Sequence, residues 1–190
     1  MNSQYHYFNE RHEERRRDKY AVVAFLPTAL DATIAAVRER YDTDHNLVRS
    51  HVTVVFPFHT VASLDELVAV IKAETYRRDP FRVELSSVGD FYPKMPVIYW
   101  RVAPCEPLME LYYGLHSKLG LAIPFKQYVP HVTVGREISH HRLLLVKDRI
   151  AGLLPDEAFR IDAVDLITPL ADQKWVSVRR FPFLGIADPL

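Results

Sequence analysis

The sequence predicts an α+β fold of two lobes, a duplicated unit in which antiparallel sheets line a central cleft and helices cover the outer faces. The phrase His-Val-Thr-Val at residues 51–54 recurs at residues 131–134. Segments of the same type precede and follow both copies in the same order. Four residues can recur by chance in a valine-rich chain, but recurrence in register with matching helices and strands indicates two equivalent halves.

Each half is expected to contain a strand, a helix, the motif strand, a second helix and a further strand. Ser63 and Glu66 have the spacing of a capping box, which predicts the start of the second helix. The last strands of the two halves, 81–84 and 159–162, share the pattern Phe-Arg-apolar-acid and are expected to correspond. The expected elements are residues 20–27, 29–41, 51–58, 63 onward and 81–84, then 96–104, 107–119, 131–135, 139–152 and 159–162, with tryptophan-containing strands at 97–102 and 175–179.

The domain organisation follows from this order. Residues 1–19 are expected to form a polar N-terminal extension, and residues 20–190 a single bilobal domain. The boundary between the two pseudo-repeats is expected near residues 90–96. An exchange of C-terminal strands between the lobes is compatible with the pattern.

The composition limits the classes of binding partner that we expect. The formal net charge is zero, with 48% hydrophobic and 25% charged residues, as in an ordinary soluble globular protein. No global field draws such a chain to duplex DNA or to an anionic membrane. A single cysteine, Cys105, forms no intrachain disulfide, and no apolar run reaches spanning length. We therefore expect a cytoplasmic protein, and the sequence leaves its oligomeric state open.

The candidate catalytic residues are His51 and Thr53 in the first motif and His131 and Thr133 in the second. Residues two apart in a strand point to the same side, so each histidine shares a face with its threonine. The alternating residues Val52, Val54 and Phe56 are expected to turn into the core. A single histidine in a strand is usually a packed or surface residue, but two in equivalent positions favour a shared site.

This pair of motifs suits in-line displacement at phosphorus. One imidazole can remove a proton from the incoming oxygen while the other protonates the departing oxygen. The threonine hydroxyls can donate hydrogen bonds to the non-bridging phosphoryl oxygens. No metal-ligand pattern is evident, so we expect neither a metal nor another cofactor.

Four further residues are candidates for substrate binding: Arg136, Tyr92, Lys94 and Lys126. Arg136 ends the second motif strand and could contact phosphate, with a surface ion pair as the alternative. An aromatic ring such as Tyr92 could stack on a base, and a lysine could pair with phosphate. Simple packing remains the alternative for the aromatic positions.

The chain resembles the 2H phosphoesterase superfamily, and within it the bacterial 2′-5′ RNA ligase-like branch. The resemblance covers about residues 20–183 and is carried by both motifs and their surroundings: Val22–Pro27, His51–Phe56, Pro130–Arg136 and Arg180–Pro182. It implies a bilobal α+β fold and chemistry on 2′,3′-cyclic phosphates or 2′-5′ phosphodiester linkages. Carried over by position, the two histidines are the acid-base pair and the two threonines the phosphate donors.

The expected function is a metal-independent phosphoesterase that acts on RNA ends or nucleotide-like phosphodiesters. One alternative is a non-catalytic module that binds RNA ends or nucleotides. Another is a phosphoesterase for a cyclic phosphate metabolite unrelated to RNA. Which histidine is the acid, and whether the cellular reaction is hydrolysis or ligation, stays open at this point.

Overall fold

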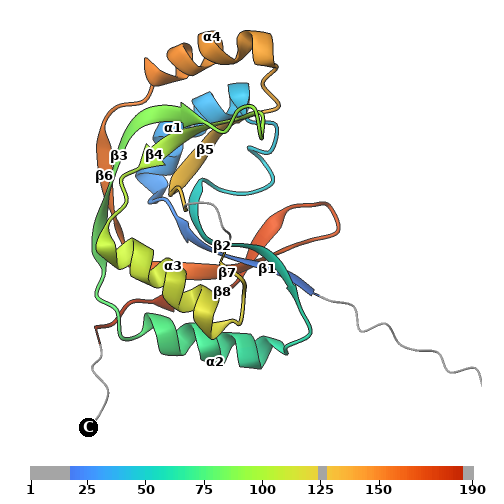
Figure 1. Cartoon of the computed structure of the whole chain (residues 1–190), viewed down its shortest axis with the longest axis vertical. Helices are drawn as coiled ribbons and strands as arrows, with labels where there is room; N and C mark the ends of the chain where they lie inside the picture. The colour runs from blue at the N-terminus through green and yellow to red at the C-terminus, as the bar shows by residue number, and fades with distance from the viewer. Residues whose placement is uncertain (1–17, 124–127, 186–190) are drawn as a thin grey trace, which may run out of the picture.

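The computed structural model describes residues 18–123 and 128–185, which form eight strands and four helices (Figure 1). In chain order they are β1 (Asp18–Phe25), α1 (Thr28–Tyr41), β2 (His51–Thr60), α2 (Leu64–Thr75), β3 (Phe81–Asp90), β4 (Val97–Val102), α3 (Glu106–Lys118), β5 (His131–Arg136), α4 (His140–Ala151), β6 (Glu157–Ile161), β7 (Ala163–Pro169) and β8 (Trp175–Pro182). The expected extension at residues 1–19 falls almost wholly outside the described residues, and β1 already begins at Asp18.

The strands form two antiparallel sheets of four strands each, which confirms the predicted α+β class. Sheet A has the order β2-β1-β7-β8, and sheet B has the order β5-β4-β3-β6. Sheet A therefore joins the first two strands of the chain to the last two, while sheet B is built from the strands between them. Both motif strands, β2 and β5, are edge strands beside the opening strand of their own half.

The helices cover the two sheets in pairs. Helices α2 and α3 pack together and against β8 and β2 of sheet A, whereas α1 packs against β5 and α4 against β3 of sheet B. Figure 1 shows α1 and α4 at one end of the molecule and α2 and α3 at the other. The start of α2 has the predicted capping box between Ser63 and Glu66. None of the described helices is long and apolar enough to cross a membrane.

The valines of both motifs point into one core. Val52, Val54, Val132 and Val134 are fully buried and join a single cluster with Trp100. The histidines and threonines of the motifs alternate with these valines and are half-buried. We call the side of sheet A that carries His51 and Thr53, and the side of sheet B that carries His131 and Thr133, the motif faces.

Phe56 does not belong to the core, contrary to the alternation expected from the sequence. Its side chain is 43% exposed, while the neighbouring Val54 and Val55 are both buried. The pairing with β1 shifts between Val23, which is opposite Thr53, and Val22, which is opposite Val55. One step along β1 thus matches two along β2, and this bulge reverses the alternation before Phe56.

The pairing of the last strands of the two halves was not predicted from the sequence. β3 and β6 lie in the same sheet and pair with each other, with Phe81 opposite Ile161 and Val83 opposite Phe159. Strand β7 was not expected at all, although it forms the centre of sheet A with β1. Its sequence is mostly apolar and buried, without the alternation of polar and apolar residues that marks a half-buried strand. The sequence pattern therefore did not distinguish it from β6.

Candidate active site

The two motif strands lie against each other at the junction of the sheets. β2 and β5 are in contact. The hydroxyl of Tyr128, just before β5, donates a hydrogen bond of 2.8 Å to the backbone carbonyl of Thr53 in β2. This bond ties the approach to the second motif to the strand of the first. The fold therefore brings the two His-x-Thr pairs into one region.

Both histidines are held by the same backbone interaction. Nδ1 of His51 lies 2.7 Å from the carbonyl oxygen of Arg49, and Nδ1 of His131 lies 2.8 Å from that of Val129. In each case the partner is the residue two positions earlier. Because a carbonyl can only accept, Nδ1 carries the proton, which assigns the tautomer and leaves Nε2 as a free base. The two imidazoles are thus oriented alike for proton transfer.

Burial disfavours the charged form of both imidazoles. It lowers the pKa of His51 to about 4, partly opposed by the bond to Arg49 and reinforced by the positive charges of Arg38, His131 and Arg136. Burial also lowers the pKa of His131, with a further contribution from the charge of Arg136 and an opposing one from its bond to Val129. The positive charge of His131 acts on His51 across the contact between β2 and β5.

Aromatic rings flank His131. The ring of Phe91 meets the imidazole edge-on at 4.9 Å between centroids, and the ring of Tyr99 lies at 5.3 Å. Phe91 and Tyr99 pack on each other at 4.3 Å. Gly89 makes room for them, because a Cβ there would lie 2.5 Å from the Tyr99 ring. Near His51, the aromatic neighbour among the described residues is Phe25, at 6.2 Å.

Arg101 is a cation on the motif face that the sequence analysis missed. It is directly opposite His131 in the pairing of β4 with β5, so the two side chains share a face. Its side chain is exposed, lies over the Tyr99 ring at 5.8 Å and contacts the Tyr99 hydroxyl at 3.4 Å, with no ion pair to any described residue. Tyr99 and Arg101 alternate with the core residues of β4, a signal that could have placed them on this face once the register was known.

The threonines and the four residues expected to bind substrate have different environments. The hydroxyls of Thr53 and Thr133 form no hydrogen bond within the described residues, so they are free to donate to a ligand. The guanidinium of Arg136 lies near two carboxylates, with Nε 3.3 Å from Asp42 and 3.4 Å from Asp44.

Tyr92 stacks on His140 at 4.2 Å, whereas Lys94 is exposed and its side chain forms no hydrogen bond or ion pair within the described chain. Lys126 lies outside the described residues. In this connection it is Phe91, immediately before Tyr92, whose ring contacts His131.

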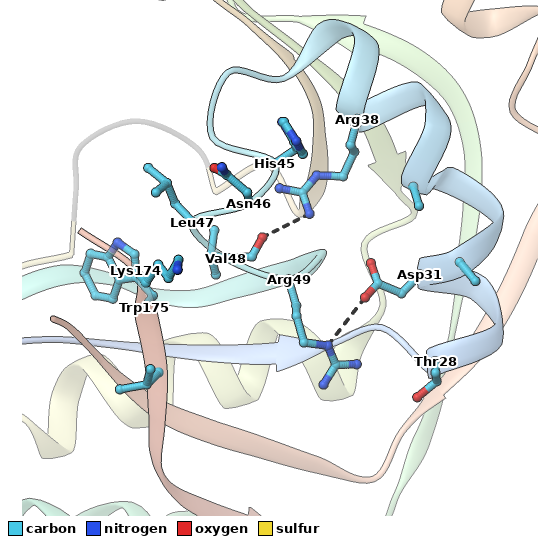
Figure 2. A pocket seen from close by; sticks show the side chains of 13 residues that line it. Thr28, Asp31, Arg38, His45, Asn46, Leu47, Val48, Arg49, Lys174 and Trp175 are labelled. Carbon is cyan, nitrogen blue, oxygen red and sulfur yellow. Dashed lines mark hydrogen bonds and ion pairs between the residues drawn. The ribbon is translucent and has the colours of Figure 1, made fainter. Parts of the chain in front are cut away.

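A cavity of about 440 Å³ lies between α1, residues 45–49 and the start of β8 (Figure 2). Arg49 lines it and pairs with Asp31 at 3.4 Å, while Arg38 donates to the carbonyl of Val48 at 3.0 Å. Neither motif histidine lines this cavity. Its walls fix residues 48–50, and so the carbonyl of Arg49 that holds His51. Within the described residues, no group of three or more His, Cys, Asp or Glu side chains could hold a metal ion.

The fold is that of known two-sheet α+β proteins. LigT of Escherichia coli, solved with 3′-AMP, is similar with a TM-score of 0.64 and 15% identity, over 88% of this chain and 98% of that one. The protein TT0787 of Thermus thermophilus is similar with a TM-score of 0.65 and 15% identity, over the same shares of the two chains.

Sequence comparison gives the family. The model of the 2′-5′ RNA ligase superfamily matches residues 26–173. The chain therefore belongs to this superfamily, the 2H phosphoesterases that its paired motifs resemble. A relative from Geobacillus kaustophilus named "Putative phosphoesterase" is 28% identical over 169 residues, 86% of this chain and 95% of its own. One from Geobacillus sp. strain WCH70 is 30% identical over 166 residues, with the same coverage.

Proposed function

We propose that this protein is a phosphoesterase that uses His51 and His131 as an acid-base pair on 2′,3′-cyclic phosphate or 2′-5′ phosphodiester linkages of RNA ends or nucleotides. The observation that carries the proposal is the matched geometry of the two imidazoles. Each donates Nδ1–H to the carbonyl two residues earlier and leaves Nε2 available. A purely structural histidine has no need for a free Nε2, and a binding module has no need for two.

The proton transfers balance between the two rings. For a cyclic phosphate, one Nε2 accepts a proton from water as the water oxygen bonds to phosphorus. The bond from phosphorus to one ribose oxygen breaks, and that oxygen takes a proton from the other, protonated imidazole. For a 2′-5′ linkage, the neighbouring 3′ hydroxyl replaces water and the 5′ oxygen departs.

The remaining groups stabilise the charge on phosphorus. In this mechanism the hydroxyls of Thr53 and Thr133 donate hydrogen bonds to the non-bridging oxygens, which carry negative charge throughout the reaction. The same charge raises the pKa of an adjacent imidazole and so favours the protonated acid. Crystal structures of LigT contain 3′-AMP, phosphate, ATP and NADP+, which supports a nucleotide-like ligand for this chain as well.

The test is turnover by the variants His51→Ala and His131→Ala. Each is expected to lower kcat by about 10²- to 10⁴-fold, the usual contribution of one acid-base group. The substrates are 2′,3′-cyclic nucleotides, 2′-5′ dinucleotides and cyclic sugar phosphates, each with and without EDTA. His141→Ala is the matched control, because this histidine is exposed on α4 and is expected to keep full activity.

The outcomes separate the alternatives. Full turnover by both motif variants would contradict the acid-base assignment. Tight binding of a cyclic nucleotide without turnover by the wild type would instead indicate a binding module. Turnover of the sugar phosphates alone would indicate a metabolite phosphoesterase with the same mechanism.

A further inference from the structure

Two arginines face each other on the motif face of sheet B, away from the histidines. Arg82 of β3 is directly opposite Arg160 of β6. A continuous register connects them to the candidate active site: His131 is opposite Arg101, and Arg101 is opposite Ser86. Ser86 and Arg82 are four residues apart in β3 with no bulge between them, so their side chains share one face.

This arrangement costs stability. Like charges directly opposite each other in an antiparallel pair are destabilising. Both arginines are exposed, and neither forms an ion pair or hydrogen bond through its side chain within the described residues. The acid on the same face between them and Arg101 is Glu84, and it is not ion-paired with any of the three. These four residues, three arginines and one glutamate, carry a net positive charge.

The motif face of sheet A has the opposite arrangement. A row of opposed residues runs across it from Thr53 through Val23 and Asp165 to Arg180. Arg180 there pairs with Asp162 at 2.9 Å and with the buried Asp165 at 3.5 Å. The fold can therefore neutralise an arginine on a motif face but leaves Arg82 and Arg160 without a partner among the described residues. Natural proteins keep an unfavourable local arrangement, such as two opposed like charges, mainly at functional positions.

We propose that Arg82 and Arg160 form a second phosphate-binding subsite, which holds the backbone of a single-stranded oligoribonucleotide whose terminal phosphate lies at His51 and His131. The inference rests on the proposed function and adds a substrate class to it. Strand spacings of about 4.8 Å and a rise of about 3.3 Å per residue put the backbones of Arg82 and His131 roughly 16 Å apart. A ligand that touches both must be longer than a mononucleotide, and Arg101 lies between them.

The test compares two substrates with the same reactive end. One is a 2′,3′-cyclic mononucleotide, and the other is a single-stranded octaribonucleotide that ends in the same cyclic phosphate. The variant Arg82→Gln/Arg160→Gln is expected to lower kcat/KM for the octanucleotide about tenfold and to flatten its dependence on salt, because two phosphate contacts are lost. Turnover of the mononucleotide is expected to stay unchanged.

The control variant is Arg142→Gln/Arg149→Gln, which removes the same charge from exposed positions of α4, the helix that packs against β3. It is expected to match the wild type on both substrates. The single variant Arg160→Gln also gives a structural readout. Its Tm is expected to equal or exceed that of the wild type because the opposed charges are relieved. A lower affinity together with an undiminished Tm distinguishes a binding role from a structural one.

Binding separates this inference from the proposed function. A fluorescein-labelled octaribonucleotide with a 3′-phosphate can be titrated by anisotropy whether or not the protein turns it over. Weaker binding by the Arg82→Gln/Arg160→Gln variant than by the α4 control supports the subsite, even if no substrate is cleaved. Equal binding by these two variants overturns it, even if the acid-base mechanism holds.

Discussion

His51 and His131 each use one ring nitrogen for structure and keep the other for chemistry. The bond from Nδ1 to a carbonyl fixes the ring, and partial burial in the junction between β2 and β5 lowers both pKa values. A lowered pKa suits the base, which must be neutral to accept a proton. A lowered pKa is unfavourable for the acid, which must be protonated to donate a proton. The acid therefore depends on the negative charge of the bound phosphate to regain its proton.

This dependence predicts an acidic pH optimum for kcat/KM, which reports the ionisation of the free enzyme. The value falls as pH drops through the pKa of the base and falls again as pH rises through the pKa of the acid. Both limbs are expected below pH 6.5, one of them near the value of about 4 for His51. The limbs of kcat are expected at higher pH, because bound phosphate raises both pKa values. Rates measured from about pH 3.5 to about pH 9 test this, and limbs of kcat/KM at or above 6.5 contradict it.

The sequence was sufficient to place the four motif residues but not their neighbours. The spacing of His51 and Thr53 defines a shared face within one strand, which is local information. Phe91 and Arg101 reach His131 only through the pairing of β4 with β3 and β5, and no local pattern specifies that register. Phe56 was misplaced for a related reason, because the bulge in β2 is set by pairing with β1.

Tyr128 connects the edge strands β2 and β5. Its ring stacks on Tyr112 of α3 at 4.0 Å, and its hydroxyl bonds to the carbonyl of Thr53. Burial raises the pKa of Tyr128, so the hydroxyl stays a donor throughout the range in which the histidines titrate. The site thus has an anchor that does not itself respond to pH.

Tyr128→Phe removes this hydroxyl and keeps the stacked ring. The free energy of unfolding is expected to fall by about 0.5–1.5 kcal/mol, the net contribution of one hydrogen bond, or somewhat more because a partly buried carbonyl loses its partner. kcat is expected to fall as well, since Thr53 loses a constraint on its backbone. Urea denaturation and turnover measure both effects. The control is Tyr113→Phe, whose exposed ring makes no hydroxyl bond within the described residues; equal results for the two variants would exclude the anchoring role.

Most of the order of the helices and strands could be predicted from the sequence, but the pairing of the strands could not. The capping box at Ser63, the helices and the strands beside each motif were predicted, because they depend on residues close in the chain. The pairing of β3 with β6, and the return of β7 and β8 to sheet A, depend on which distant strand edges meet. The similar sequences at 81–84 and 159–162 indicated that these segments correspond between the halves. They did not indicate that the two strands pair with each other.

At the scale of the whole molecule, the two halves of the chain are interleaved. α1 connects two strands of sheet A but packs on β5 of sheet B. At its end, the buried carboxylate of Asp42 accepts from Arg38 at 2.9 and 3.0 Å and lies 3.3 Å from Nε of Arg136. One acid therefore joins α1, the segment that leads to His51 and the end of the second motif strand. This carboxylate therefore connects the two motif strands at a second point, beside the bond from Tyr128 to Thr53.

Asp42→Asn is expected to be strongly destabilising for this reason. Asp42 is only 2% exposed, and its loss leaves the buried Arg38 without a counter-charge, which costs about 3–5 kcal/mol. Asp44→Asn is the matched control: this carboxylate is exposed and lies 3.4 Å from Arg136, so its loss is expected to cost at most about 1 kcal/mol. Urea denaturation of both variants measures the difference. Where Asp42→Asn still folds, kcat/KM is expected to fall too, because the segment that holds Arg49 and His51 loses its support. A small and equal loss in the free energy of unfolding of the two variants would show that the charge of Asp42 does not join the halves.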